Sequence, residues 1–150
     1  MEKYYQAYDK RYQQIHNLKL QWSSDVVTPI LQELIVQFGI RKTDKILEIG
    51  CGEGRDALWL LEQGYDVLAT DVSKEAISYC KKKNSKFSHL FFQLDVCEER
   101  LPQTFKFIYS ISVIHMLVNQ EERNRFLTFI RDHLDEDGYG LILTMGDGEY

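Results

Sequence analysis

The sequence predicts an α/β fold with a doubly wound, mostly parallel sheet. The stretch from Lys45 to Asp71 contains, in order, a short apolar run, alternating glycines, a helical pattern, a second apolar run and an acid. Short apolar runs bounded by turn residues are typical of buried strands. Further apolar runs and helical patterns alternate as far as Thr144, which favours a parallel sheet with helices packed on it. With 150 residues and 44% hydrophobic residues, the chain is long enough for one domain with a packed core.

Glycines at alternating positions form the centre of this stretch. Gly50, Gly52 and Gly54 come directly after the predicted strand of residues 46–49, and a helical pattern begins just beyond them. Because glycine lacks a Cβ, the turn can be tight and a ligand can lie against the backbone. The N-terminus of the following helix presents unpaired N–H groups, which suit an anionic group. The pattern therefore predicts a nucleotide-type site at this turn.

The acid Asp71 follows the glycines at the distance that a nucleotide-type site requires. Asp71 ends the second apolar run, twenty-one residues after Gly50, and an acid at that place can accept hydrogen bonds from ribose hydroxyls. The glycine spacing, however, is G-x-G-x-G and not the G-x-G-x-x-G of dinucleotide-binding proteins, and Glu48 on the strand is also foreign to that pattern. An NAD-dependent Rossmann oxidoreductase is therefore the less favoured alternative, as is a glycine turn that serves only as a tight connection.

The segment EIGCGEG at residues 48–54, taken together with Asp71, resembles the first motif of class I S-adenosylmethionine-dependent methyltransferases. The resemblance implies a Rossmann-like fold, S-adenosylmethionine as the cofactor and S-adenosylhomocysteine as the product. Among relatives, the stretch is most similar to the tellurite-resistance and thiopurine-type methyltransferases, which act on small molecules. The resemblance places Asp71 against the ribose, and it places the methionine part of the cofactor against Glu48, Gly50, Cys51, Gly52 and Gly54.

The resemblance also implies contacts to the adenine. Val72, directly after the acid, is expected to lie against the ring. Asp95 follows a predicted third strand at residues 90–94, and it is expected to accept from the adenine amino group while Val96 covers the ring. A carboxylate suits that amine as an acceptor. Considered alone, an Asp after a strand can equally be a turn residue or a helix cap.

In this family the segment after the fourth strand, predicted at residues 105–111, brings the cofactor methyl and the acceptor together. Ser110 is assigned to the cofactor site on this basis. His115 is the only histidine expected near this edge, since His16 is assigned to the N-terminal segment. It can take a proton from an attacking hydroxyl, amine or thiol, or it can simply pack on the cofactor. The tetrapeptides Asn-Pro-Pro-Tyr and Asp-Pro-Pro-Tyr are absent, so base amines and amide nitrogens are disfavoured as acceptors.

The N-terminal part carries an aromatic face. We expect residues 1–44 to form a helical cap and a first packing helix, and residues 45–150 to form the cofactor-binding core of a single domain. The simplest interpretation of the aromatic face is packing on the core. The resemblance implies a lid over the active site instead, with Trp22 against the cofactor and rings that stabilise a sulfonium cation. The residues of this face are Tyr4, Tyr8, Tyr12 and Ile15.

Caps and turns predict the remaining elements. Thr28, Ser73 and Asn119 each precede a helical pattern and are good N-cap residues. The acidic stretch at residues 135–138 contains a glycine and is expected to be a turn, followed by a fifth strand at residues 141–144.

Composition limits the possible functions. The net charge of −5 makes a nucleic-acid partner unlikely. No apolar run approaches the roughly eighteen residues that span a membrane, and no signal-peptide pattern opens the chain. Cys51, Cys80 and Cys97 are odd in number and contain no C-x-x-C pair. They predict neither a disulfide framework nor a metal site, so a cytoplasmic location is expected.

The predicted sheet stops at its fifth strand, whereas the family's sheet has seven. The fifth strand would then be a bare edge, and such an edge invites pairing. A homodimer through this edge is one expectation, and a monodisperse monomer in solution scattering would count against it. A piece of a longer enzyme, or a catalytically idle cofactor-binding module, are the others. Binding without turnover across a broad acceptor panel would favour the idle module.

Overall fold

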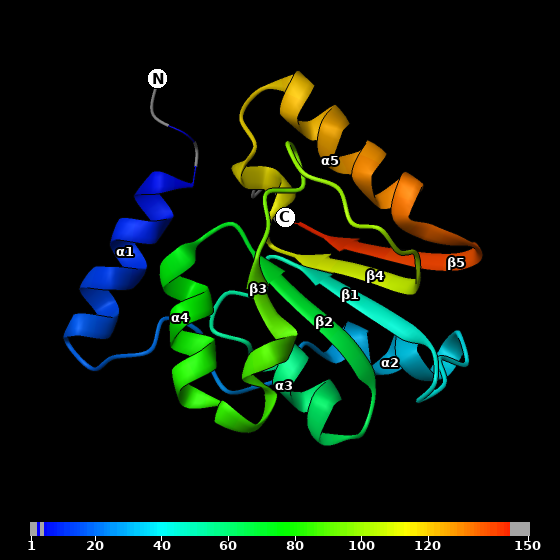
Figure 1. Ribbon diagram of the computed structural model, residues 1–150, viewed down its shortest axis with the longest axis horizontal. Coiled ribbons are helices and arrows are strands. Elements are labelled where there is room, and N and C mark those ends of the chain that lie inside the picture. The colour runs from blue at the N-terminus through cyan, green and yellow to red at the C-terminus, as the bar shows by residue number, and fades with distance from the viewer. Residues whose placement is uncertain (1–2, 4, 145–150) are drawn as a thin grey trace, which may run out of the picture.

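The computed structural model describes residues 3 and 5–144 as a parallel sheet with helices on both faces (Figure 1). Five strands form the sheet in the order β3-β2-β1-β4-β5, and every neighbouring pair is parallel. The strands are β1 (Lys45–Ile49), β2 (Asp66–Asp71), β3 (Phe91–Gln93), β4 (Phe105–Ile111) and β5 (Leu134–Leu143).

The helices divide between the two faces of the sheet. They are α1 (Gln6–Asn17), α2 (Pro29–Gln37), α3 (Arg55–Glu62), α4 (Lys74–Lys83) and α5 (Gln120–His133), with short 3₁₀ helices η1 (Ser85–Leu90) and η2 (Ile114–Met116). Ile46 of β1 packs in the core beneath α2, α3 and α4, whereas its neighbour Leu47 packs in the core beneath α5. Successive strand residues point to opposite faces, so both faces of β1 are covered and the predicted doubly wound fold is confirmed.

The order of the strands creates a crevice at one edge of the sheet. The chain runs from β1 through β2 to β3, and then returns to the other side of β1 as β4. The connections leave the carboxyl ends of β1 and β4 in opposite directions, and ligands bind at such switch points in α/β sheets. The glycine turn follows β1 directly, so it lies at this crevice.

Several predicted boundaries are confirmed. β4 coincides with the predicted strand of residues 105–111. Ser73 caps α4, because its Oγ accepts from the amide of Ala76 at 3.1 Å. Asn119 caps α5 in the same way, with Oδ1 accepting from the amide of Glu122 at 2.8 Å.

The third and fifth strands differ from the predictions. β3 begins at Phe91 and not at residue 90, because Leu90 still belongs to η1. The predicted turn at residues 135–138 lies inside β5, which begins at Leu134. Pairing with β4 jumps from Leu134 opposite Phe105 to Tyr139 opposite Phe107. The strand therefore absorbs the acidic stretch as an irregularity in its register, which makes the predicted separate turn wrong.

Thr28 occupies the N-cap position of α2 but makes no side-chain cap. Its backbone N–H donates to Oδ1 of Asp56 at 2.9 Å, and its hydroxyl donates to Oδ2 at 2.8 Å. The prediction that its side chain caps α2 is therefore wrong, because the buried carboxylate of α3 is a stronger acceptor.

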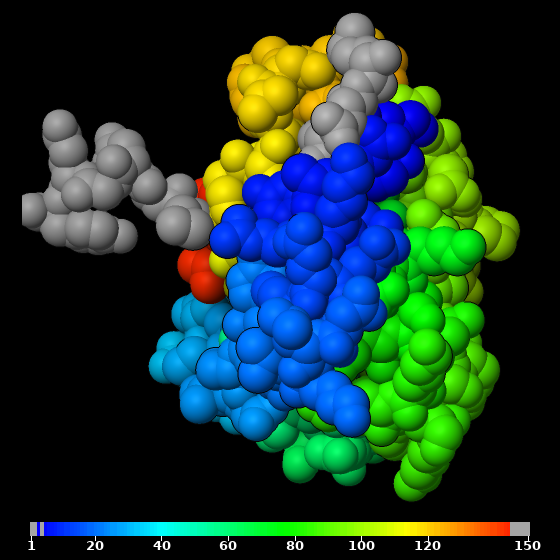
Figure 2. Space-filling model, turned by 90° about the vertical axis from the view of Figure 1, so that its left-hand side faces the viewer, coloured from blue at the N-terminus to red at the C-terminus, as the bar shows by residue number. Residues whose placement is uncertain are grey.

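The N-terminal segment, residues 5–26, runs along the crevice edge of the core. α1 packs against α4, and Figure 2, which faces this side of the molecule, shows the blue segment lying across the middle of the face beside the green α4. The division into a helical cap and a core stays a prediction. None of the helices described is long and apolar enough to cross a membrane.

Candidate functional site

The glycine turn is fixed to the end of β2. The amides of Gly50 and Cys51 both donate to the carbonyl oxygen of Thr70, each at 2.8 Å. Gly50 has a φ of +81°, a backbone conformation that residues with a Cβ rarely adopt. A Cβ at Gly50 would also overlap the side chain of Val113. The backbone of β1 and the segment after β4 therefore approach each other as closely as glycine allows.

Asp71 holds the turn from the other side. Its Oδ2 accepts from the amide of Gly52 and its Oδ1 from the amide of Ser73, each at 2.8 Å. Burial raises the pKa of Asp71 above its ordinary value, against the lowering effect of the Ser73 and Gly52 amides. Each carboxylate oxygen retains a further lone pair, so the residue can accept hydroxyl donors at the cavity while it shapes the turn.

Glu48 places a second carboxyl group in the same cavity. Its side chain is buried. Oε1 has no hydrogen bond of ordinary geometry among the residues described, and neither has the buried hydroxyl of Tyr109, although that hydroxyl is close enough to Glu48 to lower its pKa. Burial, followed by the negative charge of Asp56, raises the pKa of Glu48 well above its ordinary value. A buried acceptor without a donor is unusual in a folded protein. It suits a ligand that brings a cationic N–H group, since an opposite charge would favour the ionised carboxylate.

A third acid, Asp56, lies directly after the glycine turn, near the start of α3. The carboxylate of Asp56 accepts from Thr28 and also lies 3.3 Å from Nε of Arg55. Arg55 donates in turn to the hydroxyl of Thr28 at 3.0 Å. This network joins the start of α2 to the start of α3, directly beyond the glycine turn.

These elements enclose a cavity of about 590 Å³ at the carboxyl ends of the strands. Its volume lies within the range usual for small-molecule sites. The lining comes from three places: the glycine turn and the end of β2, the N-terminal segment, and the segment after β4.

Aromatic rings of the N-terminal segment form one wall. The Trp22 ring lies 4.7 Å from the Tyr12 ring and 6.2 Å from the Tyr8 ring, measured between centroids. The Tyr12 hydroxyl lies 3.0 Å from the position that a Cβ on Gly52 would take. Burial, followed by the negative charge of Asp71, raises the pKa of Tyr12. The N-terminal helix thus contacts the glycine turn itself and does not only pack on α4.

A family model described as a methyltransferase domain matches residues 46–138. The chain belongs to the methyltransferase domain family. The match covers β1 from Ile46 onward, β2, β3, β4 and all of α5, and it includes the glycine turn and Asp71. The predicted resemblance to class I S-adenosylmethionine-dependent methyltransferases is therefore confirmed.

Curated relatives agree with this assignment. The chain is 30% identical over 103 residues to the probable S-adenosylmethionine-dependent methyltransferase TehB of Haemophilus influenzae, covering 66% of this chain and 35% of that protein. It is 30% identical over 118 residues to a putative methyltransferase of a Geobacillus species, covering 76% of this chain and 47% of the relative. The chain thus spans between about a third and a half of the length of these relatives.

Solved structures share the fold. A TehB-like methyltransferase from Corynebacterium glutamicum is 25% identical with a TM-score of 0.64, covering 95% of this chain and 72% of that one. The glycopeptide N-methyltransferase MtfA is 20% identical with a TM-score of 0.70, covering 84% of this chain and 56% of that one. MtfA has been solved in complex with S-adenosylmethionine and with S-adenosylhomocysteine.

Most of the residues predicted for the methyltransferase site line the cavity. Tyr4, predicted for the aromatic face, lies outside the described residues. The predicted residues along the cavity are Trp22, Glu48, Gly50, Cys51, Gly52, Asp71, Val72, Val96 and His115.

Three predicted residues are not part of that lining. Gly54 takes a φ of +84° at the N-cap of α3. The hydroxyl of Ser110 donates to the carbonyl of Ile49 at 2.8 Å and so joins β4 to β1. Asp95 accepts from the amide of Cys97 at 3.0 Å, as a turn residue does. Their contribution to cofactor binding stays a prediction.

His115 is the only histidine among the described residues that line the cavity, but it is not the only histidine near the glycine turn. His16 also lies there, with Nε2 2.9 Å from Oε2 of Glu53 in the glycine turn. The sequence contained a signal for this, because His16 follows Tyr12 by one helical turn on the same face of α1. His115 lies at the cavity as predicted, and its Nδ1 is 3.3 Å from Oγ1 of Thr144.

Proposed function

We propose that this domain binds S-adenosylmethionine in the cavity and transfers its methyl group to a small-molecule acceptor. The observation that carries the proposal is the joint arrangement of the glycine turn, Asp71 and Glu48. One carboxylate is hydrogen-bonded into the turn, and the other is buried with an unpartnered oxygen. Family membership supports the same conclusion.

The residues fit the three parts of this cofactor. Glu48, which lines the cavity, offers its carboxylate to the cationic amino group of the methionine part. Asp71 offers lone pairs to the ribose hydroxyls. Val72 and Val96 line the cavity with apolar surface that suits the adenine ring.

When bound, the cofactor would supply an electrophilic methyl group on its sulfonium sulfur: the nucleophile of the acceptor would bond to the methyl carbon as the carbon–sulfur bond breaks, and S-adenosylhomocysteine would leave. Such a transfer chiefly needs alignment of the reacting atoms and exclusion of water. The rings of Tyr8, Tyr12 and Trp22 provide a rigid wall for both purposes, and aromatic faces also attract cations. His115 lies at the cavity and is placed to accept the proton that the acceptor loses.

The homodimer through the sheet edge stays a prediction. Within the described part of the chain, β5 forms that edge, and Ile142 and Leu143 on it are 37% and 38% exposed.

Calorimetric titration of the purified chain with S-adenosylmethionine, S-adenosylhomocysteine and NAD⁺ tests the cofactor. We expect micromolar binding of the first two and no binding of NAD⁺. Formation of S-adenosylhomocysteine in the presence of a panel of small hydroxyl, amine and thiol compounds then tests the transfer. Binding of NAD⁺ alone would refute the proposal, and cofactor binding without any turnover would reduce it to an idle binding module.

A further inference from the structure

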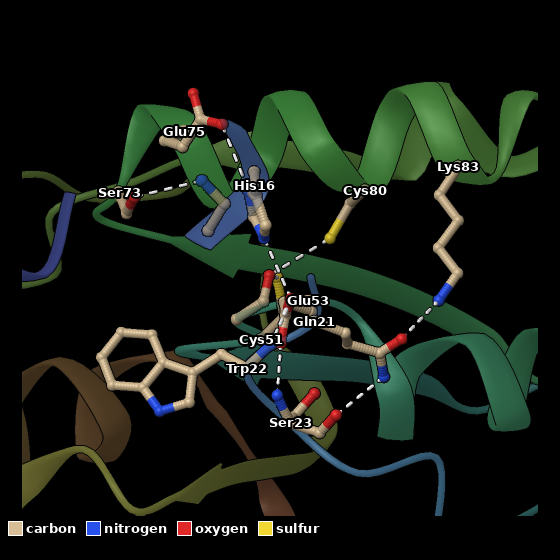
Figure 3. A network of polar contacts seen from close by, with 12 residues as sticks. His16, Gln21, Trp22, Ser23, Cys51, Glu53, Ser73, Glu75, Cys80 and Lys83 are labelled. Atoms are coloured by element: carbon tan, nitrogen blue, oxygen red, sulfur yellow. Dashed lines mark hydrogen bonds and ion pairs between the residues drawn. The ribbon is translucent and has the colours of Figure 1, made fainter. Parts of the chain in front are cut away.

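His16 is held between the glycine turn and α4. Its Nε2 lies 2.9 Å from Oε2 of Glu53 in the turn, and its Nδ1 lies 3.2 Å from Oε1 of Glu75 on α4. The imidazole ring also stacks on Tyr79, with 4.0 Å between centroids and 15° between planes. Figure 3 shows Glu53 and Glu75 on either side of the His16 ring, and we refer to His16, Glu53 and Glu75 as the histidine bridge.

The bridge needs a proton on both ring nitrogens. Ionised carboxylates only accept hydrogen bonds, and a neutral imidazole has one N–H and one bare lone pair. Neutral His16 would therefore set a lone pair against one of the two carboxylates, whereas the imidazolium donates to both. At the inner contact the side chains of His16 and Glu53 are only 8% and 2% exposed, so a neutral ring would keep its one N–H on Glu53. The bare lone pair would then face Glu75, whose side chain is 26% exposed.

Glu53 is the anionic partner. Burial raises its pKa, but the amides of Ser23 and Trp22 and the ring of His16 outweigh burial, so that the pKa of Glu53 lies below its ordinary value. The carboxylate is therefore ionised near neutral pH, and the shared proton belongs to His16.

The same carboxylate binds the N-terminal segment at two further points. The amide of Trp22 donates to Oε2 of Glu53 at 2.9 Å, and the amide of Ser23 donates to Oε1. Through these bonds the bridge fixes the backbone that carries Trp22, which lines the cavity. Glu53 lies between Gly52 and Gly54 in the glycine turn, so one residue belongs to this turn and also binds the backbone that carries Trp22.

Among the residues described, the other titratable and charged side chains around His16 form no hydrogen bond or ion pair with its ring nitrogens. Tyr12 and Tyr79 are phenols, and Lys82 and Lys83 share a small surface cavity with His16. The two lysines oppose a positive charge on the ring, but neither forms a bond to it, and Lys83 donates to Oε1 of Gln21 at 3.3 Å.

A separate contact holds the first turns of α1 without a histidine. Asp9 accepts from the hydroxyl of Ser73 at 2.7 Å and from the amide of Glu75 at 3.0 Å. Loss of the second His16 proton would therefore weaken the hold on residues 16–26, which then depends on the Trp22 and Ser23 amides at Glu53, while the start of α1 stays bound to α4.

We propose that His16 and Glu53 are positioning residues, which hold the N-terminal segment closed over the cavity more tightly while His16 carries a proton on each ring nitrogen. The proposal rests on the proposed function for its consequence, since the cavity is the one assigned to the cofactor and acceptor. Closure itself is a property of the chain without any ligand.

Hydrogen exchange of the cofactor-free chain between about pH 5 and about pH 8 tests closure directly, because histidine side chains change charge in this range. We expect the protection of the Trp22 and Ser23 amides, corrected for intrinsic exchange, to fall as pH rises. A one-proton transition allows a fall of up to about tenfold per pH unit. The amides of α2, which contains no histidine, serve as an internal reference that should not change.

Two variants separate the proton from the packing of the ring. Glu75→Gln supplies an amide that can donate to Nδ1, so a neutral His16 satisfies both neighbours and protection should persist at high pH. His16→Gln cannot titrate, so protection should be low and independent of pH. His89→Gln removes an exposed histidine outside the bridge and should behave as the unmodified chain does.

Constant protection of Trp22 and Ser23 across this pH range in the unmodified chain would overturn the proposal. So would a Glu75→Gln chain that loses protection with pH in the same way as the unmodified chain. Titration with S-adenosylhomocysteine at both pH extremes then measures the consequence. Absence of binding in every variant, with the exchange pattern intact, would count against the proposed function and leave the bridge standing.

Discussion

Replacing Asp71 with asparagine is expected to weaken the glycine turn and the cofactor site together. Both oxygens of Asp71 accept backbone N–H groups at 2.8 Å. An asparagine of the same shape has one acceptor oxygen and one NH₂ group, so one of the two amides would face a donor. A hydrogen bond to a charged group contributes about 1.5–3 kcal/mol to stability. Burial already raises the pKa of Asp71, so the neutral amide regains part of this loss and we expect a net destabilisation of about 1–2 kcal/mol.

The loss should appear in two measurements. For a domain of this size each kcal/mol lowers the melting temperature by about 2–4 °C, which gives a fall of about 2–8 °C. A lost charge-assisted bond to the ribose of about 1.5–3 kcal/mol corresponds to binding of S-adenosylmethionine that is roughly 10- to 150-fold weaker. Asp66→Asn is the matched control, because Asp66 is exposed at the opposite end of the same strand. An Asp71→Asn chain that is folded and binds within twofold of the unmodified chain would refute this account of the site.

Two further substitutions test neighbouring parts of the cavity. Gly50→Ala should lower both stability and cofactor affinity, because the new Cβ would overlap the side chain of Val113. Gly64→Ala is the control: Gly64 has a φ of +89° and no atom within 4 Å of the added Cβ, so the substitution should cost about 1–3 kcal/mol in stability and leave the calorimetric affinity unchanged. Equal losses of affinity in the two variants would contradict this. Glu48→Gln should match the unmodified chain in denaturant unfolding near pH 4 and exceed it in stability at pH 8, because a carboxyl with a raised native pKa loses stability as pH rises above its unfolded pKa of about 4.3. Its affinity for S-adenosylmethionine should nevertheless fall, and higher affinity would exclude Glu48 as a partner of the cofactor's amino group.

The local part of the fold could be predicted from the sequence. The first strand, the glycine turn and Asp71 follow from patterns within 27 residues, because each depends on the backbone freedom of glycine or on burial of a short apolar run. The bounds of β4 were predictable for the same reason. β5 was not, because its register irregularity depends on pairing between Tyr139 and Phe107, and no local pattern specifies which residues of two strands meet.

Long-range polar contacts could not be predicted at all. The periodicity of α1 indicates that Tyr8 and Tyr12 share a face, but it does not say what that face meets. Glu53 is separated by 37 positions from His16 and occupies a variable place in the G-x-G-x-G pattern. Its role arises only when α1 lies against the turn. The sequence therefore predicted Trp22 and the aromatic face near the cavity, but not the contact between His16 and Glu53 that binds this segment to the turn.

The histidine bridge and the cofactor should act on each other to the same degree. Glu53 follows Gly52, whose amide is bound by Asp71, so closing the segment and filling the cofactor site both order one turn. If S-adenosylhomocysteine raises the protection of the Trp22 and Ser23 amides by some factor at high pH, linkage requires that closure raises the affinity for S-adenosylhomocysteine by that factor.

The second factor is the gain in affinity for S-adenosylhomocysteine on closure. Calorimetry at high pH measures it as the ratio of the affinities of the Glu75→Gln chain, which should stay closed, and the unmodified chain. We expect both factors to exceed one and to agree within error. Two factors equal to one would show that the segment closes independently of the turn, and the shared position of Glu53 would then have no functional consequence.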